Sequence, residues 1–306
     1  MSAGNLLFWV AFHVFILVMV VIDLRVSGRR GDLRWREAAA LTCVWISLAL
    51  LFAAGLWRLK GASFAVEFVT GYVVEYSLSV DNIFVFLLIF SFFRVSGPHQ
   101  RRVLLWGIVG AILMRALMII GGAALLARFE WFIYVFGAFL VWTGFKIGLQ
   151  KEKKIEPDKG LLVRLARKVF PLTDGLRGSH FFVREGGRLM ATPLLLVLLV
   201  VETTDVVFAV DSIPAVFGVT RHPFIVYTSN IFAILGLRSL YFLVSGVMGK
   251  FRYLKPSLAV ILVFVGLKMC AQEFVHVSAA VSLAVIVGVL AIGVAASMLS
   301  LRRGSR

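Results

Sequence analysis

The sequence is poor in the residues that hold small secreted domains or thiolate metal centres together. Its 306 residues include only two cysteines, Cys43 and Cys270, and both lie inside apolar runs with no C-x-x-C spacing. Charged residues are also scarce, at 16% of the chain against 60% hydrophobic residues. These shortages exclude a disulfide framework, a thiolate metal site and a soluble globular domain.

Long apolar runs are what the sequence has instead. A membrane helix needs about 20 mostly apolar residues, and stretches of this kind recur along the whole chain. We therefore predict an all-α polytopic membrane protein with about nine transmembrane helices. The nine predicted spans cover residues 5–23, 37–57, 64–93, 103–127, 131–150, 192–217, 224–249, 257–275 and 277–301.

The excess of positive charge follows these spans. The formal net charge is +16, which in a soluble protein would suggest a nucleic-acid partner. Here the alternate connections between spans carry 24 Lys and Arg residues against 4 in the others. The positive-inside rule then places the N-terminus outside and the C-terminus in the cytoplasm. The charge is thereby explained by the lipid bilayer, and we expect no nucleic-acid partner.

Two of the apolar runs contain six carboxylates, five of them well inside the runs and the sixth, Glu67, near the outer end of the first. A carboxylate at the centre of a bilayer costs at least about 2.5 kcal/mol, so acids in such places are expected to have a function. The two sets align, Glu75 with Asp205 and Asp81 with Asp211, and Asn82 aligns with Ser212. We predict that these helices face each other and form one intramembrane cation site. Its predicted ligands are Glu75, Asp81, Glu202, Asp205 and Asp211, with Asn82, Ser212, Arg115 and Arg238 as secondary candidates.

Arg115 and Arg238, in spans four and seven, extend the same correspondence, as do Lys146 and Lys268 in spans five and eight. Spans 3–5 therefore repeat as spans 6–8, and three spans per repeat invert the second copy in the membrane. Many secondary transporters build a midplane site between such inverted repeats. The predicted segments are 1–63 with two spans, 64–150 as the first repeat, 151–191 as a basic cytoplasmic loop, 192–275 as the second repeat, and 276–306 with the last span and a basic tail.

The spacing of the acids suggests an irregular backbone. Residues six apart lie about 120° apart on a straight helix, so Glu75 and Asp81 would not share a face. Either the helix is unwound between them or the two acids contact different neighbours. In span six, Pro214 leaves the Val210 carbonyl without its helical donor, which predicts a broken helix at the site.

Two other segments carry weaker predictions. Residues 161–172 have the pattern of a short basic amphipathic helix on the inner leaflet, and no glycine-rich phosphate loop accompanies them. The last span is rich in small residues and uncharged, which favours lipid contact or a homodimer.

Oxygen-only ligands select hard divalent cations such as Mn²⁺, Mg²⁺ or Ca²⁺ over zinc and copper. Five negative charges exceed what one divalent ion needs, so some carboxylates are expected to be protonated in one state or paired with Arg115 or Arg238. Protonation that alternates with metal occupancy would give proton antiport. This chemistry predicts a transporter and no enzymatic activity.

The segments Glu75-x₅-Asp81-Asn82 and Glu202-Thr-Thr-Asp205-x₅-Asp211-Ser-Ile-Pro214-Ala, on nine predicted spans, resemble the TerC family of integral membrane proteins. That family is named for tellurium resistance and includes the Alx-type manganese exporters. The resemblance implies a bacterial inner-membrane protein that exports Mn²⁺ as its substrate, with these acids in the transport path. Relatives linked to stress resistance, or to supplying metal to exported enzymes, leave the physiological role open.

Two alternatives come from other classes of protein. Asp81 and Asp211 on facing helices could share a proton as in an intramembrane aspartyl protease, but the three further acids would then have no role. A scaffold without transport would use the acids and arginines only as structural ion pairs.

Overall fold

The computed structural model is built almost entirely from helices, which confirms the all-α membrane fold. It describes residues 9–10, 12–19, 21–22, 35–149, 171–185, 187–245, 253–275 and 277–304, and the side chain of Asp81 is among a few within the helices that lie outside the description. The helices are α2 (Trp35–Lys60), α3 (Ala62–Phe92), α4 (Gly97–Arg128), α5 (Phe132–Leu149), α7 (Pro193–Phe217), α8 (Pro223–Ser245), α9 (Leu254–Cys270) and α10 (Ala279–Gly304).

Seven of the described helices, α2 to α5, α7, α8 and α10, are long and apolar enough to cross a membrane. The predicted end of the eighth span, 257–275, is wrong. The helix at this place, α9, stops at Cys270, and residues 271–274 form a turn. At 1.5 Å per residue α9 is about 26 Å long, slightly less than the roughly 30 Å hydrocarbon layer. Of the first predicted span, 5–23, the described residues between 9 and 22 are helical.

Proline and glycine mark the helix boundaries. Pro98 and Pro193 lie in the first turn of α4 and α7, and Pro223 is the first residue of α8. Proline suits this position because the first backbone N–H groups of a helix have no partner to lose. Gly61, at a φ of 100°, is the single residue between α2 and α3. A positive φ favours glycine, which here allows an abrupt change of helix direction.

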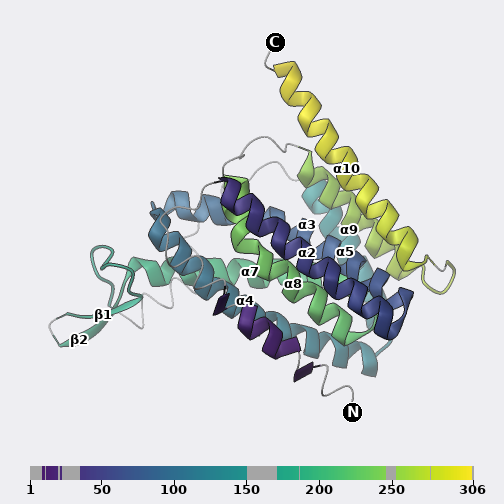
Figure 1. The fold of residues 1–306 in the computed structure, drawn as a ribbon, viewed down its shortest axis with the longest axis horizontal. Coiled ribbons are helices and arrows are strands. Elements are labelled where there is room, and N and C mark those ends of the chain that lie inside the picture. The colour runs from purple at the N-terminus through teal and green to yellow at the C-terminus, as the bar shows by residue number, and fades with distance from the viewer. Residues whose placement is uncertain are drawn as a thin grey trace.

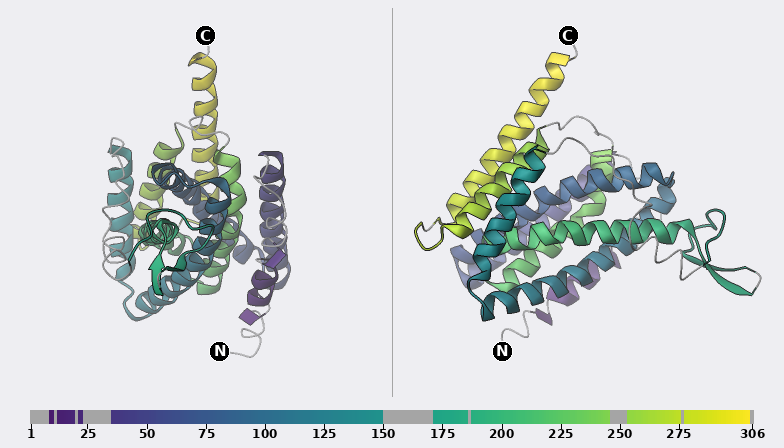
Figure 2. Two further views of the ribbon diagram at one scale, coloured as in Figure 1. Left: turned by 90° about the vertical axis from the view of Figure 1, so that its left-hand side faces the viewer. Right: turned by 180° about the vertical axis from the view of Figure 1, so that it is seen from behind.

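Helices α3 and α8 form the centre of the bundle (Figure 1). The apolar window of α8 is almost completely buried, and α3 is largely buried, whereas α2, α5 and α10 expose most of their surfaces. α8 packs against α2, α3 and α4. The C-terminal part of α10 extends beyond the other helices (Figure 2). A polar group on the inward faces of α3 and α8 is thus far from water.

Each helix of the first repeat packs on a helix of the second, as two interlocked inverted repeats would. α3 packs on α8, its counterpart α7 packs on α4, and α5 packs on α9. The α5–α9 contact is made by small residues seven apart on each helix, Gly137 and Gly144 against Gly266 and Ala259. A β-carbon at Gly137 would lie 2.8 Å from the Gly266 carbonyl oxygen, and one at Gly144 would lie 2.8 Å from that of Ala259. The pairing of the earlier residue with the later one makes the two helices antiparallel.

A β-hairpin lies beyond the start of α7 (Figure 1), and the sequence did not predict it. Strand β1 (Phe182–Glu185) pairs antiparallel with β2 (Arg188–Ala191), and Phe182 lies opposite Ala191. The predicted amphipathic helix at 161–172 lies outside the described residues except for its last two positions. Those two positions are not helical, and Leu172 forms a bridge to Ala191.

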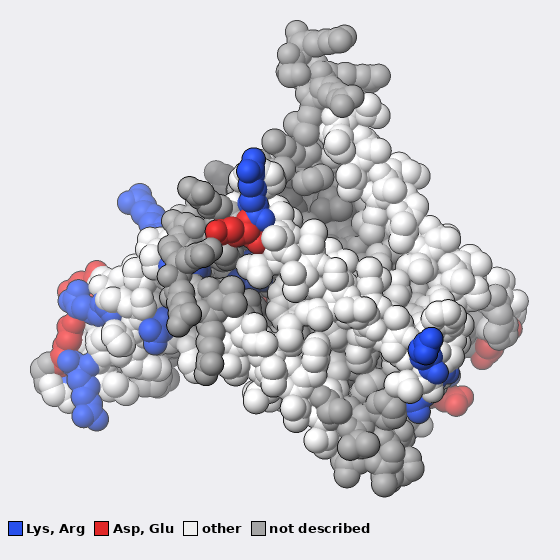
Figure 3. Space-filling model, in the orientation of Figure 1, with Lys and Arg blue, Asp and Glu red and all other residues white. Residues whose placement is uncertain are grey.

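Charge is distributed along the molecule as in a membrane protein. On the face shown in Figure 3, the described Lys, Arg, Asp and Glu side chains gather toward the ends, and the described surface between them is uncharged. In α2, for example, Arg36 and Glu37 lie in the first turn, and Arg58 and Lys60 lie in the last. The uncharged zone suits contact with lipid.

Candidate cation site between the two repeats

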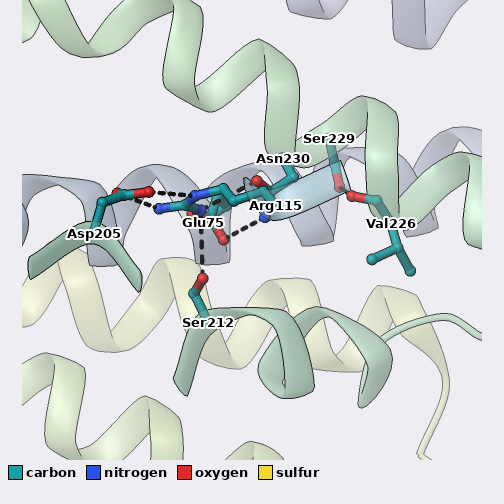
Figure 4. Close-up of polar contacts among 7 residues, drawn as sticks. All are labelled: Glu75, Arg115, Asp205, Ser212, Val226, Ser229 and Asn230. Atoms are coloured by element: carbon teal, nitrogen blue, oxygen red, sulfur yellow. Dashed lines mark hydrogen bonds and ion pairs between the residues drawn. The ribbon is translucent and has the colours of Figure 1, made fainter. Parts of the chain in front are cut away.

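Two of the predicted acids meet in the middle of the bundle. Glu75 of α3 and Asp205 of α7 both bind the guanidinium of Arg115 on α4 (Figure 4). Arg115 donates through Nη1 to Glu75 Oε1, and through Nη2 and Nε to the two oxygens of Asp205 at 2.9 and 3.2 Å. Glu75 is 0% exposed and Arg115 1% exposed. The repeats therefore contribute one carboxylate each to a single buried ion-pair cluster.

Two neutral side chains complete this cluster. Asn230 of α8 donates from Nδ2 to Glu75 Oε2 at 2.9 Å and accepts from Arg115 Nη1 at 3.1 Å. Ser212 of α7 lies 3.4 Å from the same nitrogen (Figure 4). Every oxygen of Glu75 and Asp205 consequently has a donor, as buried carboxylates require. The sequence prediction missed Asn230, although an amide within an apolar span is itself a signal of function.

The other described acids lie near this cluster but not in it. Glu202 lies one turn from Asp205 on α7, and its half-buried carboxylate occupies the space left by the missing side chain of Gly110 on α4. Asp211 accepts a hydrogen bond of 3.2 Å from Thr143 of α5. Among the described residues, no three His, Cys, Asp or Glu side chains are grouped closely enough to hold a metal ion. Of the five predicted ligands, the structure therefore brings Glu75 and Asp205 together on Arg115, and the side chain of Asp81 lies outside the description.

The predicted broken helix at Pro214 is wrong. α7 continues to Phe217 and α3 is unbroken from Ala62 to Phe92. Pro214 lies in the last turn of α7, and the helix continues through it, since Gly218 donates a hydrogen bond of 2.9 Å to the Pro214 carbonyl. Of the two alternatives for acids six apart, the second therefore describes α7, where Asp205 contacts α4 and Asp211 contacts α5.

Unpaired oxygen atoms lie along α3 next to the ion pair. Ser79 Oγ and Asn82 Oδ1 are buried, and neither has a hydrogen-bond partner among the described residues. Glu75, Ser79, Asn82 and Phe86 are four and three residues apart, so they follow one face of α3. Buried polar atoms are normally paired, and an unpaired one calls for an explanation such as a ligand or water. Oxygen atoms of this kind would suit a hard cation.

A small cavity adjoins the ion pair, with room for about one water molecule. Phe86, Arg115 and Asp205 line it together with apolar residues of α4, α7 and α8. Beyond the cavity, Tyr241 of α8 donates a hydrogen bond of 3.0 Å to Gln100 of α4 and packs edge-on against Phe90. The site is therefore enclosed by side chains on the side of the β-hairpin.

The side of the α7–α8 connection is closed as well. Gly71 of α3 leaves room for Ser229 of α8, where a β-carbon would approach Oγ to 2.9 Å. Farther out, Thr220 donates a hydrogen bond to Glu67. The second candidate arginine, Arg238, is buried in α8. Its neighbour Leu237 lines the cavity.

These features define a class: a polytopic helical membrane protein with charged and polar side chains buried where its two halves meet. Its family follows from comparison with known sequences. Residues 60–305 match the model of the integral membrane protein TerC family. The chain belongs to this family.

Close relatives extend over almost the whole chain. The membrane protein STKORF319 of Myxococcus xanthus is 50% identical over 302 residues, covering 98% of this chain and 95% of its own. Alx of Escherichia coli K12, whose name describes a candidate membrane-bound redox modulator, is 49% identical over 299 residues, covering 94% of this chain and 93% of its own. Alx of Salmonella typhi is 49% identical over 301 residues, with 95% and 94% coverage. No solved structure matches the chain.

Proposed function

We propose that this protein carries a divalent metal cation across the membrane, with Mn²⁺ as the substrate and export from the cytoplasm as the direction. The observation that carries the proposal is the meeting of Glu75 and Asp205. These acids occupy equivalent positions in the two repeats, and both are buried in apolar helices. A site at the interface of inverted repeats is the arrangement that secondary transporters use.

The chemistry of the neighbouring groups supports a hard cation. Carboxylate, amide and hydroxyl oxygens surround the centre, and the unpaired oxygens of Ser79 and Asn82 lie on the same helical face as Glu75. Such oxygens bind Mn²⁺, Mg²⁺ and Ca²⁺ well. The choice of manganese among these ions comes from the resemblance to the manganese exporters of the family.

The proposal includes an orientation and a location. The excess of basic residues on alternate connections favours an N-terminus outside and a C-terminus in the cytoplasm. The resemblance to the family implies the inner membrane of a bacterium as the location. We expect a transport function without catalysis.

Purified protein in liposomes that contain a manganese-sensitive dye tests the proposal. The wild-type protein should admit Mn²⁺, and Glu75→Gln and Asp205→Asn should abolish this flux while the exposed variant Glu130→Gln retains it. Asp81→Asn and Asp211→Asn are expected to reduce it. Absence of wild-type flux would exclude transport, and cleavage of a membrane peptide would then indicate the protease alternative, whereas neither activity would indicate a scaffold.

Two additions to this assay define the substrate and the coupling. Competition by Mg²⁺ and Ca²⁺ measures selectivity among hard cations. An imposed pH gradient tests proton antiport, which predicts Mn²⁺ accumulation driven by the gradient in a membrane held at zero potential.

A further inference from the structure

The position between Glu75 and Asp205 is occupied by a positive charge that belongs to the protein. The Arg115 guanidinium contacts both carboxylates and bridges them (Figure 4). A divalent cation held by these two acids would need the same oxygens. The guanidinium and the cation therefore compete for one place.

Charge counting makes the two occupants alternatives. The two ionised carboxylates and Arg115 together carry a net charge of about −1, and replacement of the guanidinium by a divalent cation gives about 0. Both cations together would leave a positive charge in a buried site and would repel each other. With neither present, two carboxylates would remain buried and unpaired, which is the most unfavourable arrangement.

We propose that Arg115 is a tethered counter-cation that takes the place of the transported metal between Glu75 and Asp205 whenever the site is empty. This inference rests on the proposed transport function and adds how the empty carrier returns. Metal arrival displaces the guanidinium, and metal release lets it rebind. The empty site can then switch the side of the membrane to which it opens without leaving two unpaired carboxylates inside the hydrocarbon layer.

Glu202 is the second partner that we infer for the displaced guanidinium. Glu202 lies one turn from Asp205 on α7, and its carboxylate packs against Gly110 in the same α4–α7 interface. A long side chain on a helix points toward the N-terminus of that helix, and in α4 this is the direction from Arg115 toward residue 110. The small cavity lined by Arg115 and Asp205 lies in the same interface. Glu202→Gln should therefore weaken Mn²⁺ binding, because the displaced guanidinium loses this partner.

Removing the guanidinium should separate two modes of transport. In Arg115→Gln the metal-loaded site is unchanged, so exchange of radioactive manganese across liposomes that contain Mn²⁺ on both sides should persist. Net Mn²⁺ movement requires the empty site to return and should fall about tenfold or more. Titration of the detergent-solubilised variant with Mn²⁺ should show binding about tenfold tighter or more, because the internal competitor is absent.

The exposed variant Arg177→Gln is the matched control and should change none of these quantities. Equal loss of exchange and net movement in a folded Arg115→Gln protein, or unchanged Mn²⁺ affinity, would overturn the inference. If that variant does not fold, Arg115→Lys decides. Lysine keeps the charge but cannot form the two-point contact with Asp205, so retained net transport supports a counter-cation and its loss indicates a structural clamp. A wild-type protein that neither binds nor moves Mn²⁺ would refute the proposed function itself, whatever the variants do.

Discussion

The two repeats have the same helical plan, but they contribute different groups to the centre. The first supplies Glu75 from α3 and Arg115 from α4, and the second supplies Asp205 from α7 and Asn230 from α8. The acids are equivalent, whereas the guanidinium that binds both, that of Arg115, comes from the first repeat. The shared plan thus fixes where the site lies, and the difference between the repeats fixes its charge.

The two sides of the ion pair also differ in how closely the helices pack. On the side of the α7–α8 connection, a β-carbon at Gly71 would approach Ser229 and Val216 within 3.1 Å. On the side of the β-hairpin, a β-carbon at Gly107 would meet Val201 only at 3.4 Å, and the small cavity lies there. The remaining free space near the ion pair therefore lies toward the β-hairpin.

The largest expected effect comes from removing the group that distinguishes the repeats. Arg115→Ala leaves Glu75 and Asp205 buried without a counter-charge, which should lower the stability by about 3–5 kcal/mol. Denaturant titration in detergent measures the loss. Arg177→Ala, which breaks the exposed pair with Glu185, should have almost no effect. Similar effects of the two substitutions would mean that the buried pair is not the main electrostatic contact.

A smaller effect is expected where the repeats are most alike. Gly144→Ala places a methyl group 2.8 Å from the Ala259 carbonyl oxygen and 2.7 Å from Val263, so α5 and α9 must separate. Overpacking of this kind costs about 1–3 kcal/mol. Gly148→Ala, on the same helix, meets Ala259 at an ordinary 3.6 Å and is the control. Equal melting temperatures for the two variants would show that α5 and α9 can move apart without loss of stability.

The next effect concerns an acid outside the central cluster. Thr143→Val removes the hydrogen bond to Asp211 with little change in shape. We expect a loss of about 1 kcal/mol in the denaturant titration. Transport should also fall if Asp211 lies in the path, and Thr203→Val, whose hydroxyl bonds only to the backbone carbonyl of Leu199, is the comparison. Unchanged transport would place Asp211 outside the path.

The smallest effect is expected at the closure toward the β-hairpin. Tyr241→Phe keeps the ring against Phe90 and removes the hydrogen bond to Gln100. The stability should fall by about 0.5–1 kcal/mol, and net Mn²⁺ movement should rise because this side opens more readily. A lower rate would show that the bond is needed for transport itself.

The membrane fold and the two-part site follow from features that a sequence displays directly. Apolar length predicts spans, and the aligned Glu75 and Asp205 predict a meeting of the two halves. The partner that each acid contacts was harder to predict, because it depends on how the helices are rotated about their axes and how they cross. Five acids in two spans suggested one cluster, yet Asp211 faces α5 and Glu202 occupies the space beside Gly110.

Other differences have equally local causes. Pro214 suggested a broken helix, but a proline removes only one hydrogen bond from the helix, and α7 continues past it to Phe217. Asn230 was overlooked because it has no acidic counterpart in the first repeat. The β-hairpin was missed because its strands have four residues each, too few to show a clear alternation.

The glycine contacts between α5 and α9 restrict which substitutions these two helices can accept. A β-carbon at either Gly137 or Gly266 would meet the backbone carbonyl of the other residue, and a carbonyl cannot change rotamer as a side chain can, so a larger residue at position 137 cannot be accommodated by repacking at 266. Each of the two packed helices therefore restricts which residues the other can carry at this contact. A larger residue at position 137 or 266 is therefore tolerated only if the two helices move apart.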